Sequence, residues 1–565
     1  MARQPYTDVA DLTGTADRFA AALPALAGAL AQPTTDAPLE RVREGLFYLG
    51  AACIDRVREL EAEGQRALAD VVAPDLLRPF PSATILELSV EKVGRRVPAG
   101  AEVTTKGPRP CRFRTVSELR VGPWGVEQAR IEGPHTLRFD LVAEGSSLAD
   151  AVGGIRPRFF IDGAEGARRL LAHVLAHTKS AELFLEGGGA ALPLGAVMPY
   201  GTRADQTLTS EPDEPRTGLA LLREYFLLPE KFCFFALGGL TAALRGTSAR
   251  RATVTLTFRE PLPVQATATP TIRAHCVPAT NLFPASAEPW VFEAGRTSAP
   301  VRVAGLSRDE AGAYAVLGAS AMARDPLEGR DDAAPTELRP VRRFAAQESP
   351  PEFPYAFSAK LVAPPGRAEP EIVVCLTSPR GRPPVLTPHI VSLDLLATNR
   401  QRASRLRPGE LTEPGARMPP GVRIRNIVPC SAYVPPPTGP ELALQVAVRA
   451  AVPDGDALFA LQSRLLALVP RQGVDPAAVR ANVVRVAAIQ HLEVAAVIDR
   501  AAASRGYEVR LAIDETPFEG LGDVALFVRV LCAAFDAQAS IGRFYRCVAT
   551  ATKSGTRIVW PPEAP

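Results

Sequence analysis

The segment LALLREYFLLPEKFCFFALGGL, at residues 219–240, concentrates large apolar side chains in the middle of the sequence. Five aromatic residues lie between Tyr225 and Phe235, although aromatic residues make up only 6% of the chain. Aromatic side chains bury large areas and tend to dominate the energetics of cores and interfaces. This concentration makes the segment the first candidate for an element on which other parts of the fold pack.

The local pattern changes within this segment. Its first apolar residues follow helical spacing at positions 221, 222, 225 and 228, and Pro229 then prevents the helix from continuing. Residues 232–237 are apolar on both faces, which predicts a strand buried on both sides. A helix that enters a buried strand through Pro229-Glu230-Lys231 would anchor its neighbours. Residue chemistry alone leaves a second interpretation open, in which the segment is the middle of one large core.

Length and composition predict a multidomain globular protein. The 565 residues are enough for several domains. The 54 prolines and 43 glycines favour turns, strands and loops over long helices. The net charge of +3 argues against a dedicated nucleic-acid-binding protein.

The apolar segments and cysteines indicate a cytoplasmic protein without membrane insertion. The longest uncharged apolar runs, at residues 19–32 and 232–244, fall short of the ~20 residues that a membrane-spanning helix needs. Acidic residues precede the first run and Pro24 interrupts it, so we interpret it as a helix rather than a signal peptide. The eight cysteines are widely scattered, which predicts buried free thiols in a reducing compartment.

The order of periodic patterns predicts an α+β multidomain fold, with an N-terminal helical segment, a β-rich central body and a C-terminal α/β domain. We expect five parts: a helical bundle segment at 1–78, a β-rich domain with one helix at 79–215, a central anchor region at 216–300, a β-rich domain with Pro/Arg-rich loops at 301–440, and the α/β domain at 441–565.

A narrow apolar stripe marks the N-terminal part. Its members step by three and four residues: Leu39, Val42, Leu46, Leu49, Cys53, Val57 and Leu60. Such a stripe suits helix–helix packing or a short coiled coil. The pattern is compatible both with a core helix of this chain and with a helical bundle shared with a partner.

Alternating patterns predict most of the remaining elements. Expected strands in the first half include 85–90, 112–116, 127–131, 136–142, 159–161, 181–185 and 252–258, with a helix at 164–177. In the C-terminal domain we expect a helix around 458–468, strands at 483–489 and 507–513, a helix from Leu521 to about Ala537, and strands at 544–550 and 557–560.

Candidate catalytic and metal-binding residues form weak patterns. His173 and His177 are four residues apart on the expected helix, but a zinc-protease glutamate and a third ligand are missing. His275 and Cys276 are adjacent, so on a strand they would point to opposite faces. Ser320 lacks the second glycine of a nucleophile elbow. The carboxylate pairs Asp514/Glu515 and Glu224/Glu230 suit turns and salt bridges. We therefore predict no catalytic, metal-binding or cofactor-binding residues.

A set of short motifs extends over nearly the whole chain. In order they are Leu77-Arg78-Pro79 with Pro81-Ser82, Cys111-Arg112-Phe113-Arg114-Thr115, Leu222-Arg223-Glu224-Tyr225-Phe226, Pro229-Glu230-Lys231-Phe232, Phe234-Phe235, Gly239-Leu240, Asn281-Leu282-Phe283-Pro284, Thr398-Asn399-Arg400, Arg505-Gly506, Asp514-Glu515 with Phe518 and Gly520, Ala539-Ser540-Ile541 with Phe544, and Trp560-Pro561-Pro562. This ordered set resembles TssF, the large baseplate wedge protein of bacterial type VI secretion systems. The sequence departs from the family pattern at Gln401-Arg402 and Gly542-Arg543.

The resemblance implies a structural protein without a cofactor. TssF-like proteins form a wedge of two copies around one TssG, and six wedges surround the VgrG spike hub. TssK, TssE and the sheath are further implied partners, and the implied location is a cytoplasmic baseplate docked at the inner-membrane complex. The resemblance implies structural or interface roles for Leu222, Glu224, Tyr225, Phe226, Pro229, Glu230, Lys231, Phe232, Phe234, Phe235, Asn281, Leu282, Phe283, Pro284 and Trp560.

Two other functions stay open at this point. The departures from the family pattern are compatible with a wedge protein of a related contractile injection particle or phage tail. From a different class, a hydrolase would use His275 or the pair His173/His177.

Overall fold

The computed structural model is a mixed, β-rich α+β protein, which confirms the predicted fold class. It describes residues 37–153, 157–203, 206–209, 219–262, 270–292, 298–323, 335–341, 356–362, 369–377, 389–450, 457–499, 504–537, 539 and 543–561. The predicted helix at residues 19–32 and the departure at Gly542 lie outside these ranges. Residue contacts divide the chain into a smaller unit, residues 1–77 with 438–446, and a larger unit containing the rest.

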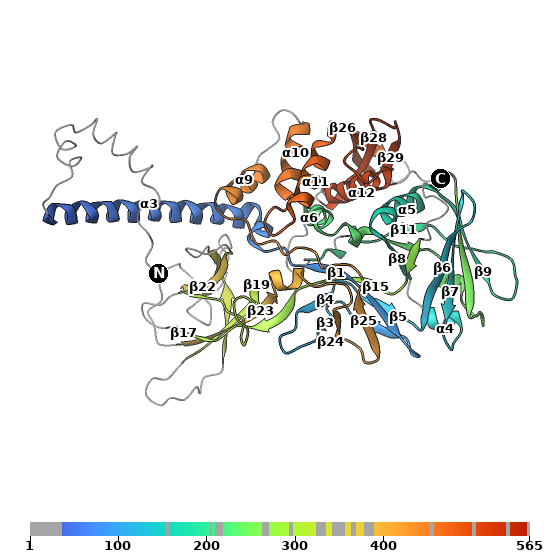
Figure 1. The fold of residues 1–565 in the computed structure, drawn as a ribbon, viewed down its shortest axis with the longest axis horizontal. Coiled ribbons are helices and arrows are strands. Elements are labelled where there is room, and N and C mark those ends of the chain that lie inside the picture. The colour runs from blue at the N-terminus through green and yellow to red at the C-terminus, as the bar shows by residue number, and fades with distance from the viewer. Residues whose placement is uncertain are drawn as a thin grey trace. The chain divides into compact units, whose positions relative to one another are not determined.

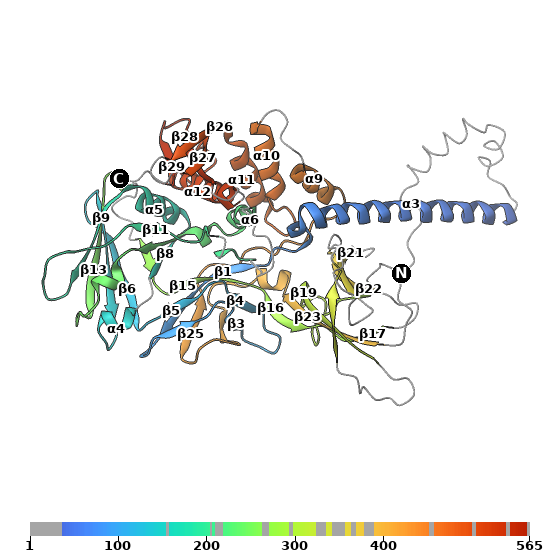
Figure 2. The same cartoon turned by 180° about the vertical axis from the view of Figure 1, so that it is seen from behind.

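The smaller unit is built on one long helix. This helix, α3 (Ala37–Val72), is followed by a 3-10 turn, η1 (Pro74–Leu77), and is labelled in Figures 1 and 2. Ala69, Ala73 and Leu76 at its end pack against Leu442 and Val446 of α9 (Gly439–Ala450).

Sheets dominate the larger unit, and nearly all their described strand pairs are antiparallel. The exceptions are the pair β20 (Thr336–Pro340) and β21 (Ala356–Val362) and the pair β27 (Ser504–Ile513) and β28 (Arg543–Ala551), which are parallel. The six-stranded sheet has the order β24 (Leu411–Pro414), β3 (Glu102–Thr105), β4 (Arg112–Thr115), β15 (Cys276–Thr280), β1 (Ala83–Val90), β25 (Val422–Asn426). The five-stranded sheet has the order β10 (Leu192–Pro193), β9 (Thr178–Leu185), β13 (Arg251–Phe258), β7 (Thr136–Ala143), β6 (Trp124–Ile131).

Smaller sheets connect these two. One has the order β11 (Val197–Pro199), β12 (Phe234–Leu237), β8 (Arg158–Asp162), β14 (Thr271–Arg273), and a two-stranded ribbon pairs β2 (Arg95–Val97) with β5 (Leu119–Val121). Figure 2 shows β9 and β13 side by side in the five-stranded sheet, and β6 at the edge of the same sheet. Its central strand β13 shows the sequence logic, because Ala252, Val254 and Leu256 alternate into the core and are nearly fully buried.

The eight-stranded sheet follows in the chain. Its order is β16 (Phe283–Ser286), β23 (His389–Thr398), β19 (Gly312–Ala323), β20 (Thr336–Pro340), β21 (Ala356–Val362), β22 (Glu371–Thr377), β18 (Ser298–Pro300), and β17 (Trp290–Phe292) also pairs with β23. Strand β19 was not predicted from the sequence, because its residues are mostly small and two register shifts interrupt the alternation of its side chains.

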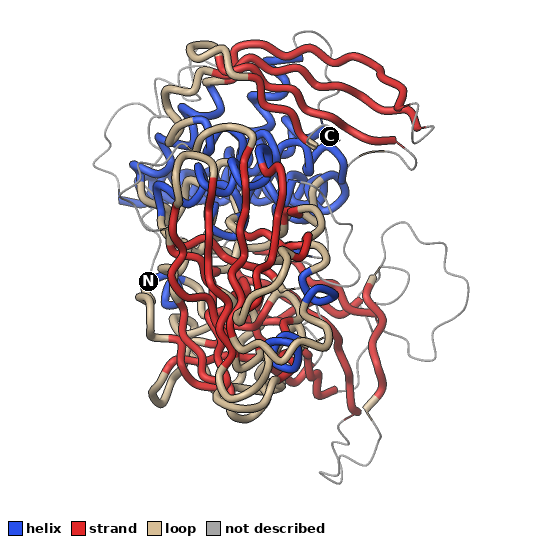
Figure 3. Tube along the Cα trace, turned by 90° about the vertical axis from the view of Figure 1, so that its right-hand side faces the viewer, coloured by secondary structure: helices blue, strands red, loops and turns tan. Residues whose placement is uncertain are grey.

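The last sheet has the order β26 (Ile489–Asp499), β27 (Ser504–Ile513), β28 (Arg543–Ala551), β29 (Arg557–Trp560). Figure 3 shows this sheet as a layer beside the helices. The remaining helices are α4 (Leu148–Val152), α5 (Ala164–His177), α6 (Leu219–Leu227), the 3-10 turn η3 (Pro229–Phe232), α7 (Leu240–Ala243), α8 (Gln401–Ser404), α10 (Ala457–Leu468), α11 (Pro476–Ala487) and α12 (Leu521–Ala537).

Helix α12 is the central helix of this region. It contacts α5 and α6, and it also covers β28 and β29 (Figure 1). The approach to α5 requires glycine at position 522, where an added Cβ would lie 2.2 Å from the Cα of Arg169. The predicted boundaries of α5 and α12 agree with the structure, because both helices carry a strong apolar periodicity.

Two local predictions were wrong. The strand expected at 483–489 is the end of helix α11, and strand β26 begins only at Ile489. Asp475 caps α11 by accepting a hydrogen bond from the N–H of Ala477 (3.0 Å), and Pro476 is its first residue. These two signals for the start of a helix outweigh the preference of the valines at 483–489 for a strand. The strand expected from Phe232 begins at Phe234, because η3 occupies the residues before it.

We expect the substitution Phe235→Ala to lower the stability of the larger unit. The Phe235 side chain is fully buried, and truncating such a residue costs ~3–5 kcal/mol through lost transfer energy and the cavity left behind. Thermal unfolding of the purified full chain measures the effect. Phe184→Ala, in a partly exposed phenylalanine of β9, is the matched control and should cause a smaller loss. Equal effects of the two substitutions would contradict the assignment of Phe235 to the core.

Candidate functional site

Residues 219–240 contribute side chains to three separate apolar cores. Leu221, Leu222, Tyr225, Phe226 and Phe232 join a C-terminal core formed with α12 and the strands β26–β28. Phe234 joins a central core with Phe80 and Phe160. Phe235 and Leu237 join the core of the five-stranded sheet. The segment is therefore an anchor between cores, which decides between the two interpretations of its sequence.

The aromatic rings of this segment make specific contacts in each core. The ring of Tyr225 lies 5.4 Å from that of Phe527 in α12, and the ring of Phe234 lies 4.8 Å from that of Phe160. Phe235 stacks on Phe159 at 5.4 Å. Neighbouring residues on β12 point to opposite faces, so Phe234 and Phe235 reach different cores from one strand.

A buried ion pair joins the two halves of the segment. The Nζ of Lys231 in η3 binds Oε2 of Glu224 in α6, and both side chains are fully buried. The other carboxylate oxygen of Glu224 accepts a hydrogen bond from the backbone N–H of Leu208 at 2.6 Å. The ammonium group also lies 4.9 Å from the centre of the Phe232 ring. The pair closes the turn that Pro229 imposes between α6 and β12.

Each partner of this pair depends on the other for its charge. Burial raises the pKa of Glu224 and lowers the pKa of Lys231, because both charged forms lose their hydration. The opposite charge of the partner counteracts both shifts. The neighbouring Glu230 is half-buried, and burial raises its pKa as well.

Arg529 connects the anchor to the end of the chain. Its guanidinium group extends from α12 and donates a hydrogen bond from Nη2 to the carbonyl oxygen of Phe232 at 2.6 Å. The same group lies 5.8 Å from the ring centre of Trp560 in β29. Burial lowers the pKa of Arg529 to about 10. Arg529 thus links Trp560 to residues 219–240. The sequence did not predict this role of Arg529.

Asp523, at the start of α12, is a second buried charge centre. Its carboxylate contacts Arg168 of α5 at 3.0 Å and Arg485 of α11 at 3.2 Å. It also accepts a hydrogen bond from the Tyr225 hydroxyl at 3.3 Å. The partial positive charge of a helix N-terminus favours an acid at this position. The available sequence signal was one acid in the first turn of a mainly apolar helix.

The charges around Asp523 shift the pKa values of its neighbours. Burial by itself lowers the pKa of Arg168, but the Asp523 carboxylate more than compensates and raises it. Burial and the same carboxylate raise the pKa of the Tyr225 hydroxyl. The Tyr225 hydroxyl therefore stays protonated and can donate to Asp523, and the contacts of Asp523 hold α5, α6, α11 and α12 together.

Three of the sequence motifs meet at Asn281. Its Oδ1 accepts hydrogen bonds from the Thr398 hydroxyl (2.8 Å) and the Asn399 N–H (2.7 Å). Its Nδ2 donates to the carbonyl oxygen of Arg112 (2.6 Å) and to Oδ1 of Asn399 (2.9 Å). Asn281, Thr398 and Asn399 are nearly fully buried. The Asn281 amide thus connects β4, β15 and β23.

The rest of the predicted turn packs around this node. Leu282 contacts Tyr314 and Leu396 in a small apolar cluster. Phe283 joins the core of the eight-stranded sheet, and Arg112 lies over its ring at 5.4 Å. Pro284 pairs with Leu396 in the β16–β23 ladder. The predicted anchor residues therefore fall into two groups: those of residues 222–235, with Trp560 reached through Arg529, and those around Asn281.

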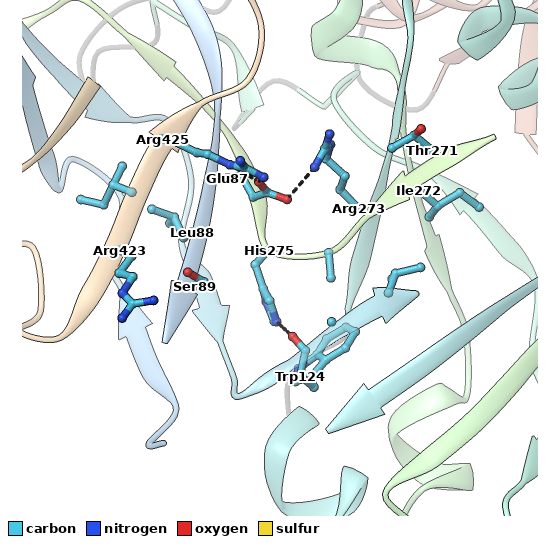
Figure 4. A pocket seen from close by; sticks show the side chains of 14 residues that line it. Glu87, Leu88, Ser89, Trp124, Thr271, Ile272, Arg273, His275, Arg423 and Arg425 are labelled. Atoms are coloured by element: carbon cyan, nitrogen blue, oxygen red, sulfur yellow. Dashed lines mark hydrogen bonds and ion pairs between the residues drawn. The ribbon is translucent and has the colours of Figure 1, made fainter. Parts of the chain in front are cut away.

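A cavity of about 510 Å³ lies where three sheets end. Edge strands β6, β14 and β25 contribute to its lining, together with β1. Figure 4 shows Glu87 in this cavity between Arg273 and Arg425, with contacts of 3.2 and 2.6 Å. Arg273 also pairs with Asp162 at 2.7 Å, so the charges near the cavity largely compensate each other.

His275 and Cys276 do not form a catalytic pair. His275 has a positive φ of 55°, and its Nε2 lies 2.9 Å from the carbonyl oxygen of Trp124 (Figure 4). Burial lowers the pKa of His275 to about 4. Cys276 points into the central core, where burial raises the pKa of its thiol well above the usual value. A neutral imidazole and an unionised thiol in separate surroundings do not support nucleophilic chemistry.

The other candidate residues have structural contacts. His173 stacks near His177 at 4.8 Å, and its Nε2 lies 3.1 Å from the carbonyl oxygen of Glu260. Within the described ranges, no three His, Cys, Asp or Glu side chains are grouped to hold a metal ion. Asp514 accepts a hydrogen bond from the N–H of Thr516 in a turn (2.9 Å). None of the helices in the described part of the chain is long and apolar enough to cross a membrane.

We expect Lys231→Met to destabilise the protein strongly and a second substitution, Glu224→Gln, to restore part of the loss. Removing one partner of a buried pair leaves an uncompensated charge and costs about 3–5 kcal/mol. Glutamine can still accept the hydrogen bond from Leu208 without the charge. Thermal unfolding of both single variants and the double variant measures the coupling. Additive losses would show that the pair contributes no specific interaction energy.

We expect His275 to make stability fall as the pH drops from 6.5 towards 4. The folded state holds this histidine neutral, with a pKa of about 4 against 6.5 for an ordinary histidine. The unfolded chain therefore binds one more proton in this window, which costs about 3 kcal/mol over the whole window. The variant His275→Asn tolerates the positive φ and should show a flatter dependence of melting temperature on pH. Identical pH profiles would contradict the assignment.

Comparisons with known proteins agree on one family. A family model described as "Type VI secretion system, TssF" matches residues 7–565. The type VI secretion system component TssF1 of Pseudomonas aeruginosa is 27% identical over an alignment 310 residues long, and this alignment covers 48% of this chain and 49% of that protein. The match therefore spans about half the length of this relative.

Two solved structures share the fold. One chain of the type VI secretion system TssK-TssF-TssG baseplate subcomplex aligns with a TM-score of 0.74 and 21% identity, covering 93% of this chain and 99% of that chain. A chain of the baseplate complex from the type VI secretion system aligns with a TM-score of 0.55 and 19% identity, covering 98% and 97%. The family model spans nearly the entire sequence, so the resemblance of the motifs is confirmed, and the protein belongs to the TssF family of type VI secretion systems.

Proposed function

We propose that this protein is a structural wedge subunit of a type VI secretion baseplate, in which two copies assemble with one TssG-like chain. Family membership supports the proposal, and so does the fold shared with a chain of a TssK-TssF-TssG subcomplex. In this proposal the wedge surrounds the VgrG spike hub, contacts TssK and TssE, and supports assembly of the sheath. It acts in the cytoplasm at the inner-membrane complex and catalyses no reaction.

The observation that carries the proposal is the exposed apolar stripe of α3. The helix has 36 residues and a length of roughly 54 Å. Leu49, Val57 and Leu60 of the stripe are 60%, 55% and 50% exposed, and Cys53 between them is exposed too. The same three- and four-residue steps continue through Gly64 to Leu68 and Val71, whose side chains are also about half exposed.

An exposed stripe of this length needs a partner of matching shape. Exposed apolar surface of this extent marks protein–protein interfaces. A narrow stripe with three- and four-residue steps packs best against other helices. The exposure therefore favours the shared bundle over a core helix of the same chain. The apolar stripe is compatible with a TssG-like chain and a second copy of this protein as the bundle partners.

We expect the triple variant Leu49→Asp, Val57→Asp, Leu60→Asp to lose the TssG-like partner. Three carboxylates on the stripe would have to be buried without counter-charges if the bundle formed. The variant is co-expressed with the TssG-like protein of the same gene cluster. Native mass spectrometry then measures how many copies of each chain the complex contains. The unmodified chain should give two copies to one. Leu317→Asp in β19, at a position that is 55% exposed, is the control and should keep the complex.

An unmodified chain that stays monomeric when it is co-expressed with the TssG-like protein would contradict the proposed function. A complex that survives the triple substitution unchanged would instead contradict the role of the α3 stripe. Circular dichroism of the variant confirms that α3 still forms, so that lost binding is not lost folding.

A further inference from the structure

Strand β26 is a long edge strand with an open side. It has 11 residues and pairs with β27, while its other side ends the sheet. Gln462 covers the beginning of that side by donating a hydrogen bond to the carbonyl oxygen of Ile489 at 2.8 Å. From His491 onward, no hydrogen bond from another described residue reaches the open side. On this side, residues 491–499 therefore present backbone donors and acceptors to which no described residue binds.

The sequence of this edge is mainly apolar, and Glu493 is its one charged residue between 492 and 498. Residues 492–498 read LEVAAVI, and they contain no lysine, no proline and no register shift. Leu492, Val494, Ala496 and Ile498 alternate onto one face, where Val494 is 52% and Ile498 67% exposed. Soluble proteins usually protect such edges with charges, prolines or bulges, because an open apolar edge pairs with other strands. The composition of this edge favours pairing over protection.

The two faces of the sheet differ in chemistry. Leu492 and Val494 lie opposite Leu511 and Val509 of β27, which are buried in the C-terminal core. The other face carries a charged ladder, in which Arg510 contacts Glu508 at 2.9 Å and Glu493 at 3.5 Å. A strand added at β26 would therefore extend an apolar face on one side and a solvated polar face on the other.

We propose that β26 pairs antiparallel with β26 of a second copy of this chain, with Ala495 at the centre of the pairing. The inference rests on the proposed function, in which one wedge holds two copies. The two sheets would then join into one continuous sheet through a two-fold interface, where the same residues contribute from both copies. Backbone hydrogen bonds supply the affinity and the alternating side chains fix the register.

The strand is complementary to itself in this register. Centring on Ala495 sets Leu492 opposite Ile498 and Val494 opposite Ala496, so apolar residues meet on one face. Glu493 then lies opposite Val497. A shift of the centre to Ala496 would set Glu493 opposite Asp499, and like charges directly opposite are destabilising. Centring on Val494 would set Ile498 opposite Gln490 and lose apolar contact. This self-complementarity identifies a second copy as the occupant.

Cysteine cross-linking tests the register directly. In the full chain carrying Cys53→Ser, which removes the exposed native thiol, Ala495→Cys should form a disulfide between copies. Opposite residues in an antiparallel pair have Cα atoms about 4.5–5.5 Å apart, within disulfide range. Oxidised glutathione accepts the two electrons and two protons that the thiols lose, and a non-reducing gel shows the dimer.

Glu493→Cys is the matched control on the same strand. In the proposed register the two introduced cysteines, one from each copy, would lie four residues apart along the strand. This separation is roughly 13 Å, which is too far for a disulfide. It should therefore give no cross-link. Cross-linking of Glu493→Cys in preference to Ala495→Cys would overturn the proposed register.

A second variant tests the interface without a new thiol. Val494→Lys with Ile498→Lys should weaken self-association about tenfold or more in light scattering, because each copy would bring two ammonium groups into the joint. Both side chains are exposed, so the fold should persist. Val484→Lys in α11, where Val484 is 51% exposed, is the control and should leave self-association unchanged.

The same experiments separate this inference from the proposed function. They are performed on the chain alone and on its complex with the TssG-like protein. Two copies in the complex without an Ala495→Cys cross-link in either sample would overturn the strand pairing and leave the proposed function intact. If a different protein binds at β26 and the Ala495→Cys cross-link is absent for that reason, the strand pairing is overturned as well. A cross-link in the chain alone, with one copy per complex, would support the pairing and contradict the stoichiometry.

Discussion

The buried ion pair between Glu224 and Lys231 is the constraint on which the central region depends. Pro229 ends α6, and the chain must turn within η3 to enter β12. The pair fixes this turn from inside the protein, where neither charged group is in contact with water and each is stabilised by the other. Because the turn is fixed, Tyr225 and Phe226 before it reach the C-terminal core, whereas Phe234 and Phe235 after it reach two other cores. One short segment thereby sets the relation of three packed regions.

Two further polar nodes use the same principle. The Asp523 carboxylate gathers side chains from α5, α6 and α11, and the Asn281 amide gathers backbone and side-chain groups from β4 and β23. Buried polar groups cost free energy unless their hydrogen bonds are satisfied, so each node tolerates only one arrangement of its neighbours. Apolar packing supplies most of the stabilisation, whereas these nodes select one geometry. Such selection suits a subunit whose surfaces must match other subunits.

The two surfaces proposed for assembly differ in their physics. The α3 stripe offers side chains at helical spacing and suits a bundle, in which apolar contact provides the affinity. The β26 edge offers backbone groups, and its side chains act mainly through register. A helix stripe accepts partners of different sequence, whereas an edge strand with a self-complementary sequence favours its own copy. The two surfaces use different contacts and can therefore contribute to one assembly at the same time.

The sequence by itself determined the class of fold, the positions of α5, α12 and β29, and the family. Strong periodicity defines long elements, and an ordered set of motifs is specific even where each motif is weak. Local pattern failed at residues 483–489, where a proline and a capping aspartate outweighed β-branched residues, and at β19, whose small residues and register shifts hide its alternation. The roles of Asp523 and Arg529 were decided only by the tertiary structure. Arg168 and Tyr225, which bind Asp523, and Phe232, which binds Arg529, lie about 300 residues or more away from them in sequence. Chain pattern carries no information about which distant groups share one buried site.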